Sequence, residues 1–201
     1  MTMRIAVAVS GRGSNLEALL RALGPGAPAR VVVVLSNRAD AAALERARAH
    51  GVAAEVLADP AEPADWLEPL GRHEVDLLVL AGYIKLVPAG VIRRYRGRIL
   101  NVHPALLPAF GGKGMYGRRV HEAVLASGAK ESGATVHLVD EVYDRGAVLA
   151  RGRVPVLPGD DPDVLAARVL EVEHRLLPAV VLAAAAAGRP VPLPEPVELQ
   201  P

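Results

Sequence analysis

The sequence predicts an α/β fold: a doubly wound, mostly parallel sheet with helices on both faces, in a single domain. Hydrophobic residues make up 51% of the chain but aromatic ones only 3%, so the core must consist mainly of Ala, Val and Leu. Such a composition is typical of helices covering a parallel sheet, whose central strands are apolar on both faces. Short β-rich runs also alternate with helical stretches, as in repeated βα units. A length of 201 residues suits one compact domain.

Each βα unit places a strand before a helix, because parallel strands need a crossover connection. The expected strands are Arg4–Val9, Arg30–Leu35, Val52–Leu57, Val75–Leu80, Arg98–Val102, Ala134–Asp140 and Ala147–Val156. The expected helices are Asn15–Leu23, Ala41–His50, Val87–Tyr95, Val120–Ala126 and a last one that Asp161-Pro162 begins and Gly188 ends. An N-cap Asp followed by Pro is a strong helix-start signal. Residues 1–188 are expected to form the domain, and the proline-rich tail 189–201 to be extended and loosely attached.

Charge and composition exclude several classes of function. Lys and Arg number 23 against 22 Asp and Glu, so the chain has no global field to hold nucleic acid or an anionic membrane. The absence of cysteine excludes disulfides, thiolate nucleophiles and Cys-based metal sites, and no histidine pair has zinc-ligand spacing. The apolar run Leu176–Gly188 falls short of the roughly 20 residues of a membrane span, and no targeting segment is visible. A cytoplasmic protein is expected, and any phosphate that it binds must be held by local groups.

The segment Ser10–Asn15, with the sequence SGRGSN, follows the first strand and opens the first helix. Glycines let the backbone turn tightly, and free N–H groups at a helix start favour an anion such as a phosphate. The alternative is a plain β-to-α turn with Ser14 as N-cap. A dinucleotide site fits less well, because Leu16 replaces the third glycine of that motif.

The stretch Asn101-Val102-His103-Pro104 ends a predicted strand. Side chains alternate along a strand, so Asn101 and His103 project to the same side, at the carboxyl end where open α/β sheets bind ligands. An amide donor and an imidazole aimed at one point suit a developing oxyanion. Asp144 lies in the loop after another strand, where a carboxylate near His103 would stabilise its imidazolium. Alternatively, none of the three is functional: Asn101 caps the end of the strand, His103 packs in a loop and Asp144 lies on the surface in a turn.

Five motifs carry a family resemblance. SGRGSN, AGYIKL, NVHPALLP, SGATVHLVDE and VEH before Leu176-Leu177-Pro178 stand in the order and spacing of the phosphoribosylglycinamide formyltransferases, which the chain resembles over about residues 3–188. The resemblance implies the formyltransferase fold and the transfer of a formyl group from 10-formyltetrahydrofolate to the amine of phosphoribosylglycinamide in purine biosynthesis. It also implies small-molecule substrates, no metal and no nucleic acid, in a monomer or a homodimer.

The resemblance assigns roles to residues that match the motifs. Asn101 and His103 would polarise the formyl group and hold the tetrahedral oxyanion, while Asp144 would raise the pKa of His103 and help to move the proton of the amine. The substrate phosphate and ribose would contact Gly13, Ser14, Asn15, Pro104 and Glu173. The folate slot would be formed by Leu80, Ile84, Lys85, Leu86, Val87, Ile99, Asn101, Val139 and Asp140. His137 lies on a predicted strand with its side chain toward the site, where it would contact the catalytic residues and not the substrate.

The chain departs from the family pattern in four places. Ala105 stands where many relatives carry Ser, and Arg145-Gly146-Ala147 replaces the usual residues after the aspartate. The glycine-rich segment Gly111–Gly117 resembles one branch of the family only. It belongs to the long loop Ala105–Gly117, and loops of this length in a compact domain often have a function. No residue of Asp59–Trp66 matches the arginine that contacts folate in the family.

Other functions of the same motifs stay open. A 10-formyltetrahydrofolate hydrolase would use water in place of the amine, and relatives of that kind carry an extra N-terminal domain. Methionyl-tRNA formyltransferase has the same Asn, His and Asp but continues into an RNA-binding domain. The short proline-rich tail of this sequence has no cluster of basic residues, so a tRNA substrate is not expected. A nucleotide-binding regulatory module would bind a ligand without catalysis.

Overall fold

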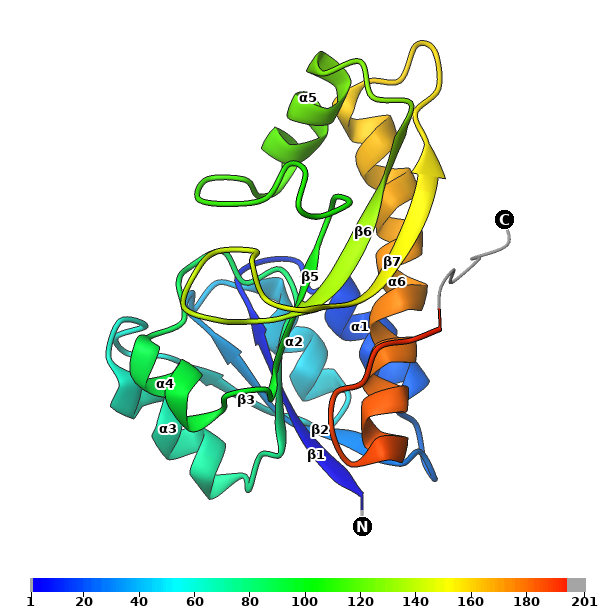
Figure 1. The fold of residues 1–201 in the computed structure, drawn as a ribbon. Helices are drawn as coiled ribbons and strands as arrows, with labels where there is room; N and C mark the ends of the chain where they lie inside the picture. Colours follow the sequence, from blue (N-terminus) through cyan, green and yellow to red (C-terminus); the bar gives the residue numbers. More distant parts are fainter. Residues whose placement is uncertain (1, 195–201) are drawn as a thin grey trace.

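The computed structural model describes residues 2–194, which form one seven-stranded sheet of order β3-β2-β1-β4-β5-β6-β7 (Figure 1). The chain fills the sheet outward from β1, first to β2 and β3 and then to β4 and β5, and these five strands run parallel. The last two strands are antiparallel to their neighbours. The predicted doubly wound, mostly parallel sheet is therefore confirmed. The strands are β1 (Met3–Val9), β2 (Ala29–Ser36), β3 (Ala53–Val56), β4 (Leu77–Leu80), β5 (Ile99–His103), β6 (Glu131–Leu138) and β7 (Val148–Pro155).

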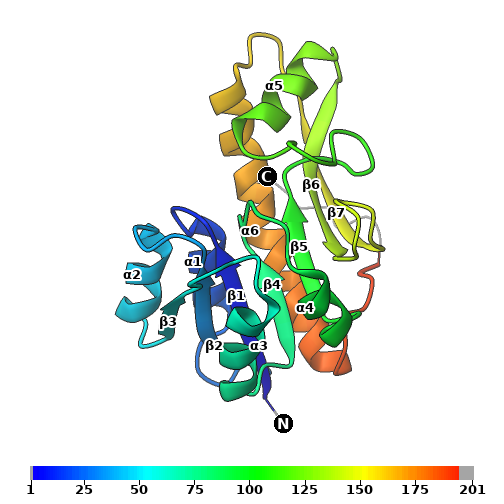
Figure 2. The ribbon, with the colours of Figure 1, turned by 90° about the vertical axis from the view of Figure 1, so that its left-hand side faces the viewer.

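Helices cover both faces of the sheet, as Figure 2 shows with α3 and α4 in front of the strands and α6 behind them. One face carries α1 (Ser14–Ala22), α2 (Ala42–Ala49) and α6 (Pro162–Ala187), with α5 (Arg118–Ala126) packed on α6. The other face carries α3 (Pro63–Arg72) and α4 (Ala89–Arg94). Within residues 2–194, none of these helices combines the length and the apolar character that crossing a membrane requires.

Strand alternation divides the core into two clusters. Ile5 and Val7 of β1 join the cluster under α1, α2 and α6, whereas Ala6 and Ala8 of the same strand join the one under α3 and α4. All four side chains are completely buried, as expected for a central strand that packs on both faces. This packing makes β1, and the loop that leaves its carboxyl end, a rigid base for a site.

The structure adds a helix that the pattern did not predict. The α3 helix begins at Pro63 and also contains Pro69, and prolines usually break a helical pattern. It forms because Trp66 and Leu70 are fully buried on the second core cluster, with Trp66 edge-on to Tyr83 at a centroid distance of 5.1 Å. Tertiary packing therefore outweighs a weak local signal.

The first residues of the predicted tail lie against the edge strand β7. The backbone N–H of Leu193 donates to the carbonyl oxygen of Leu149 at 2.8 Å, and its side chain packs on the larger core cluster. An edge strand offers unpaired carbonyl groups, so an adjacent extended segment can satisfy one of them. The rest of the tail lies outside the described residues.

Candidate active site

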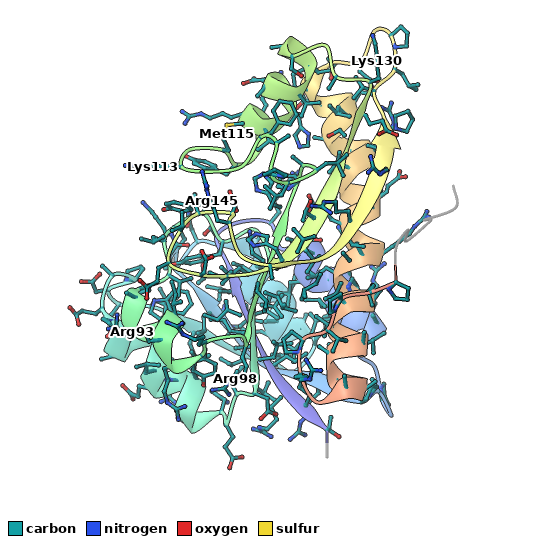
Figure 3. All side chains as sticks on the ribbon, viewed as in Figure 1. Arg93, Arg98, Lys113, Met115, Lys130 and Arg145 are labelled. Carbon is teal, nitrogen blue, oxygen red and sulfur yellow. The ribbon has the colours of Figure 1, made fainter. Side chains whose placement is uncertain are left out.

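A cavity of about 1060 Å³ opens at the carboxyl ends of β1, β4 and β5. Its walls come from the loop after β1, the segment after β4, the end of β5, the loop 104–117, the loop 139–147 and one side of α6. Figure 3 shows Lys113 and Met115 on the first of these long loops and Arg145 on the second, on the same side of the molecule. Segments far apart in the sequence thus surround one space, as the position of ligands in open α/β sheets predicts.

The end of β5 presents two polar side chains to this cavity. Asn101 and His103 both line it, and Pro104 follows where the strand stops. Across the antiparallel pairing, Asn101 lies opposite His137 of β6, and His103 lies opposite Thr135. His137 also lines the cavity, because paired residues of neighbouring strands point to the same face.

The imidazole of His103 is fixed by two contacts. Its Nε2 lies 2.8 Å from the main-chain oxygen of Phe110, and its Nδ1 lies 3.7 Å from Oδ2 of Asp144. Only 4% of the side chain is exposed. Burial lowers the pKa of His103 below its ordinary value, and Asp144 and the Phe110 carbonyl offset this only in part. The expected effect of Asp144 has the right sign, but the net shift is downward, so His103 is neutral at neutral pH.

Asp144 is held by the loop that faces it. The backbone N–H of Gly112 donates to Asp144 Oδ2 at 2.8 Å, and Asp144 itself has a φ of 55°, a conformation rare for residues with a side chain. Burial by itself would raise the pKa of this carboxyl, but its contacts with His137, the Gly112 N–H and His103 outweigh burial and lower the pKa. Asp144 is therefore a carboxylate at neutral pH.

A chain of polar contacts links Asn101 to the main chain. The amide nitrogen Nδ2 of Asn101 lies 3.1 Å from Nε2 of His137, and Nδ1 of His137 lies 2.8 Å from the carbonyl oxygen of Leu138. Nε2 of His137 also lies 3.5 Å from Oδ1 of Asp144. The three predicted catalytic residues thus converge with His137 in one corner of the cavity.

In the loop after β1, which is predicted to bind an anion, Gly11, Arg12, Ser14 and Asn15 line the cavity, whereas Gly13 is not among its lining residues. Gly13 is the N-cap of α1 with a φ of 78°, and a side chain there would meet Ala43, whose Cβ lies 2.6 Å from the position of an added Cβ. The α2 helix braces the loop, since Ala43 N–H donates to the Gly11 carbonyl and Arg46 Nε donates to the Arg12 carbonyl. Among residues 2–194, no side chain caps α1, which leaves its first N–H groups available to an anion.

Glu173 lies beside this loop on α6. Its Oε2 accepts a hydrogen bond from Asn15 Nδ2 at 2.5 Å, and both residues line the cavity. Burial raises the pKa of Glu173 to about 7, although the hydrogen bond from Asn15 acts in the opposite direction. The buried Oδ1 of Asn15 has no hydrogen-bond partner among the described residues. The pair therefore offers acceptor oxygens to the hydroxyl groups of a bound molecule.

The predicted folate residues divide into two groups. Ile84, Lys85, Leu86, Val87, Val139 and Asp140 line the cavity, together with the buried Leu80. Ile99 does not line it and is 1% exposed in the core under α3 and α4, because it lies one strand period deeper than Asn101. The loop at Ile84 is anchored by its N–H, which donates to Ser10 Oγ at 3.1 Å.

Some groups that shape the site had no sequence signal. The carbonyl of Phe110 and the N–H of Gly112 belong to the main chain, so residue type could not identify them. Arg12, Tyr83 and His121 also line the cavity; of these, Arg12 lies within the predicted anion loop and could have been named from it. Among residues 2–194, no three His, Asp or Glu side chains are grouped as ligands for a metal ion.

Known proteins resemble the chain in sequence and in structure. The model of the formyl transferase family matches residues 3–181. A chloroplastic phosphoribosylglycinamide formyltransferase of Arabidopsis thaliana is 46% identical over 89% of this chain, and the match spans 64% of the plant protein. The phosphoribosylglycinamide formyltransferase of Escherichia coli K12 is 38% identical over 89% of this chain and 85% of its own length.

Solved structures agree with these matches. Glycinamide ribonucleotide transformylase 1 from Symbiobacterium toebii superposes with a TM-score of 0.86 at 41% identity, over 92% of this chain and 89% of that one. A phosphoribosylglycinamide formyltransferase from Brucella melitensis superposes with a TM-score of 0.84 at 44% identity, over 92% and 97% of the two chains. A formyltetrahydrofolate deformylase from Pseudomonas syringae, at 23% identity and a TM-score of 0.83, shares the fold.

Proposed function

Because the chain belongs to the formyl transferase family, we propose that its cavity transfers a formyl group from 10-formyltetrahydrofolate to the amine of phosphoribosylglycinamide. The observation that carries the proposal is the convergence of three polar side chains on one part of the cavity. Asp144 lies 3.7 Å from His103 and 3.5 Å from His137, and His137 lies 3.1 Å from Asn101. The loop after β1, which we propose binds the substrate phosphate, lines the same cavity through Gly11, Arg12, Ser14 and Asn15. Relatives named for this reaction, at 38–46% identity, support the choice of substrate.

The proposed reaction is an acyl transfer without a covalent enzyme intermediate. The amine nitrogen of the substrate forms a bond to the formyl carbon, and the carbonyl oxygen takes up negative charge. The bond from the formyl carbon to N10 of the folate then breaks. The amine loses one proton and N10 gains one, so the reaction needs no other reactant.

We assign the transfer of that proton to His103. Its pKa is lowered by burial, so it enters the reaction neutral and can accept the proton of the attacking amine, directly or through a water molecule. The resulting imidazolium is stabilised by the carboxylate of Asp144 and can donate to the new oxyanion and then to N10. Asn101 adds an N–H donor to the same oxyanion.

Binding of the acceptor is assigned to the residues around α1. The N–H groups that follow Gly13 would hold the phosphate, next to the positive end of the helix dipole. Glu173 and the unpaired oxygen of Asn15 would accept hydrogen bonds from the ribose hydroxyls. The folate would lie along the Ile84–Val87 segment and Val139, where apolar side chains line the cavity.

One assay tests this proposal. The protein is mixed with 10-formyltetrahydrofolate and glycinamide ribonucleotide, and the folate absorbance is followed with the acceptor omitted as control. Conversion that depends on the acceptor supports the transferase. Release of formate at the same rate without any acceptor would assign the site to hydrolysis, and no conversion in either case would contradict both reactions.

A further inference from the structure

We infer that two main-chain carbonyls hold His103 and His137 in opposite tautomers, so that His137 is a positioning residue for the amide of Asn101. In this arrangement Nδ1 of His103 and Nε2 of His137 are the unprotonated ring nitrogens, and both face the catalytic corner. The consequence for catalysis rests on the proposed function, whereas the tautomers themselves do not.

The tautomer of His103 follows from its contact with Phe110. A carbonyl oxygen can only accept a hydrogen bond, so Nε2, which lies 2.8 Å from the Phe110 oxygen, carries the hydrogen. The neutral ring then has its lone pair on Nδ1, on the side of Asp144 Oδ2 at 3.7 Å. Nδ1 is therefore the nitrogen that takes up and returns the proton during catalysis.

The tautomer of His137 follows from the same rule applied to the other nitrogen. Nδ1 lies 2.8 Å from the Leu138 carbonyl oxygen and must carry the hydrogen. The lone pair of the neutral ring is then on Nε2, which accepts from Nδ2 of Asn101 at 3.1 Å. This fixes the amide of Asn101 and leaves its second N–H free for the oxyanion of the substrate.

The alternative partner of His137 is disfavoured by charge. Nε2 of His137 also lies 3.5 Å from Asp144 Oδ1, but it could donate there only if the ring were doubly protonated. Such an imidazolium would be 2% exposed, and it would lie beside Asp144 when His103 becomes positive. Two cations would then share one carboxylate, which weakens its stabilisation of His103. A neutral His137 avoids this competition.

Long-range proton–nitrogen NMR spectra of the isotopically labelled full-length protein near neutral pH test the tautomers directly. Spectra of His103→Gln and His137→Gln assign the two rings by loss of their signals. We expect protonation at Nε2 only for His103 and at Nδ1 only for His137. A reversed tautomer in either ring, or a doubly protonated His137, would overturn the inference.

Kinetics test the positioning role separately. In His137→Gln the side-chain oxygen can still accept from Asn101, whereas His137→Leu offers no acceptor. We expect kcat to fall by ~10- to 100-fold in the Leu variant, approaching the loss of an oxyanion donor, with KM nearly unchanged and most of kcat retained in the Gln variant. Equal losses in both variants would contradict the role. The NMR result stands even if the wild-type protein has no transferase activity, so a failure of the proposed function is distinguishable.

Discussion

At the scale of single residues, the site depends on groups whose ionisation is set by burial. His103 and Glu173 are both buried, and burial keeps each in its neutral form over a wider pH range: it lowers the pKa of His103 and raises that of Glu173. Asp144 is different, because its contacts with His137, the Gly112 N–H and His103 outweigh its burial, lower its pKa and keep it ionised. The site thus combines a neutral imidazole with a carboxylate beside it, as the proposed proton transfer requires.

Replacement of His103 by Ala should abolish most turnover while both substrates still bind. The change removes the proton carrier and a charged donor to the oxyanion, and loss of one such donor alone costs about 10²–10³ in rate. Steady-state kinetics and equilibrium binding of each substrate check this. Turnover close to that of the wild type would refute the role of His103.

The Asp144→Asn substitution should lower the pKa of His103 further and reduce kcat. The carboxylate favours the imidazolium, and each pKa unit lost corresponds to about 1.4 kcal/mol, or about tenfold in rate if the full charge develops in the transition state. Titration of the His103 ring by NMR in both proteins measures the shift. An unchanged pKa, or an unchanged pH–rate profile, would show that the two residues do not act together.

Replacement of Glu173 by Gln should stabilise the ligand-free protein at alkaline pH. The pKa of Glu173 is about 7 in the folded state, against an ordinary value of 4.5. The contribution of the protonated carboxyl to stability is therefore fully present below pH 4.5 and is lost as the pH rises through about 7. The free energy of unfolding falls by an amount on the order of 3 kcal/mol. Gln can still accept a hydrogen bond from Asn15 but does not ionise, so the variant avoids this loss. Denaturant unfolding at acidic and alkaline pH tests this. A stability difference that is the same at both pH values would contradict the assignment.

At the scale of elements, the loop 104–117 positions the side chains of His103 and Asp144 through its main chain. It provides the Phe110 carbonyl to His103 and the Gly112 N–H to Asp144. Between them, a Cβ added at Gly111 would lie 2.5 Å from Leu107 Cδ2 and 3.1 Å from Asp144 Cβ. The close approach of the loop to Asp144 therefore requires glycine at this position.

A Gly111→Ala substitution should reduce kcat, because the methyl group displaces Asp144 from the Gly112 N–H. The flexible end of Leu107 can move aside, whereas Asp144 Cβ is attached to the backbone. We expect a loss of about tenfold or more, since displacements near 1 Å can cost up to about 10²-fold in rate. Gly71→Ala is the matched control, because an added Cβ there meets nothing within 4 Å. Equal kcat values in both variants would show that the loop tolerates the methyl group.

At the scale of the whole molecule, the cavity joins the rigid base of the sheet to elements from the second half of the chain. The loop after β1 is held by α2, and the pair Asn15 and Glu173 connects α1 to α6 over 158 residues of sequence. A ligand that contacts both parts stabilises the folded state, because it does not bind the unfolded chain.

Glycinamide ribonucleotide should therefore raise the melting temperature of the protein, and the ribonucleoside without the phosphate should raise it much less. At about 100 times Kd, binding adds about 2.7 kcal/mol, which corresponds to roughly 5–11 °C for a chain of this size. Thermal unfolding with each compound at the same concentration checks this. Similar shifts for the two compounds would place the phosphate outside the anion loop.

Short sequence patterns predict most of the helices and strands correctly. The run Ile5–Val9, the glycine turn after it and the start signal at Asp161-Pro162 act over a few neighbouring residues, and the structure has β1, α1 and α6 at these places. The sequence pattern does not predict α3, because this helix is stabilised by the burial of Trp66 and Leu70, which depends on parts of the chain distant in sequence.

The family resemblance wrongly predicts Ile99 as a residue of the folate slot. A matching motif does not show how deep in the sheet a residue of a strand lies.

By itself, the sequence determined the class of fold, the strand end at Asn101 and His103, and the glycine turn that opens α1, since backbone preference and side-chain alternation are local properties. Only the tertiary structure decided that Asp144 meets His103, that Glu173 meets Asn15, and which nitrogen of each imidazole faces the cavity. The orientation of Asp144 and of the two imidazoles depends on main-chain carbonyl and N–H groups, which are nearly the same in every residue and are placed only when the loops pack. The contact of Glu173 with Asn15 depends on the packing of α6 against α1.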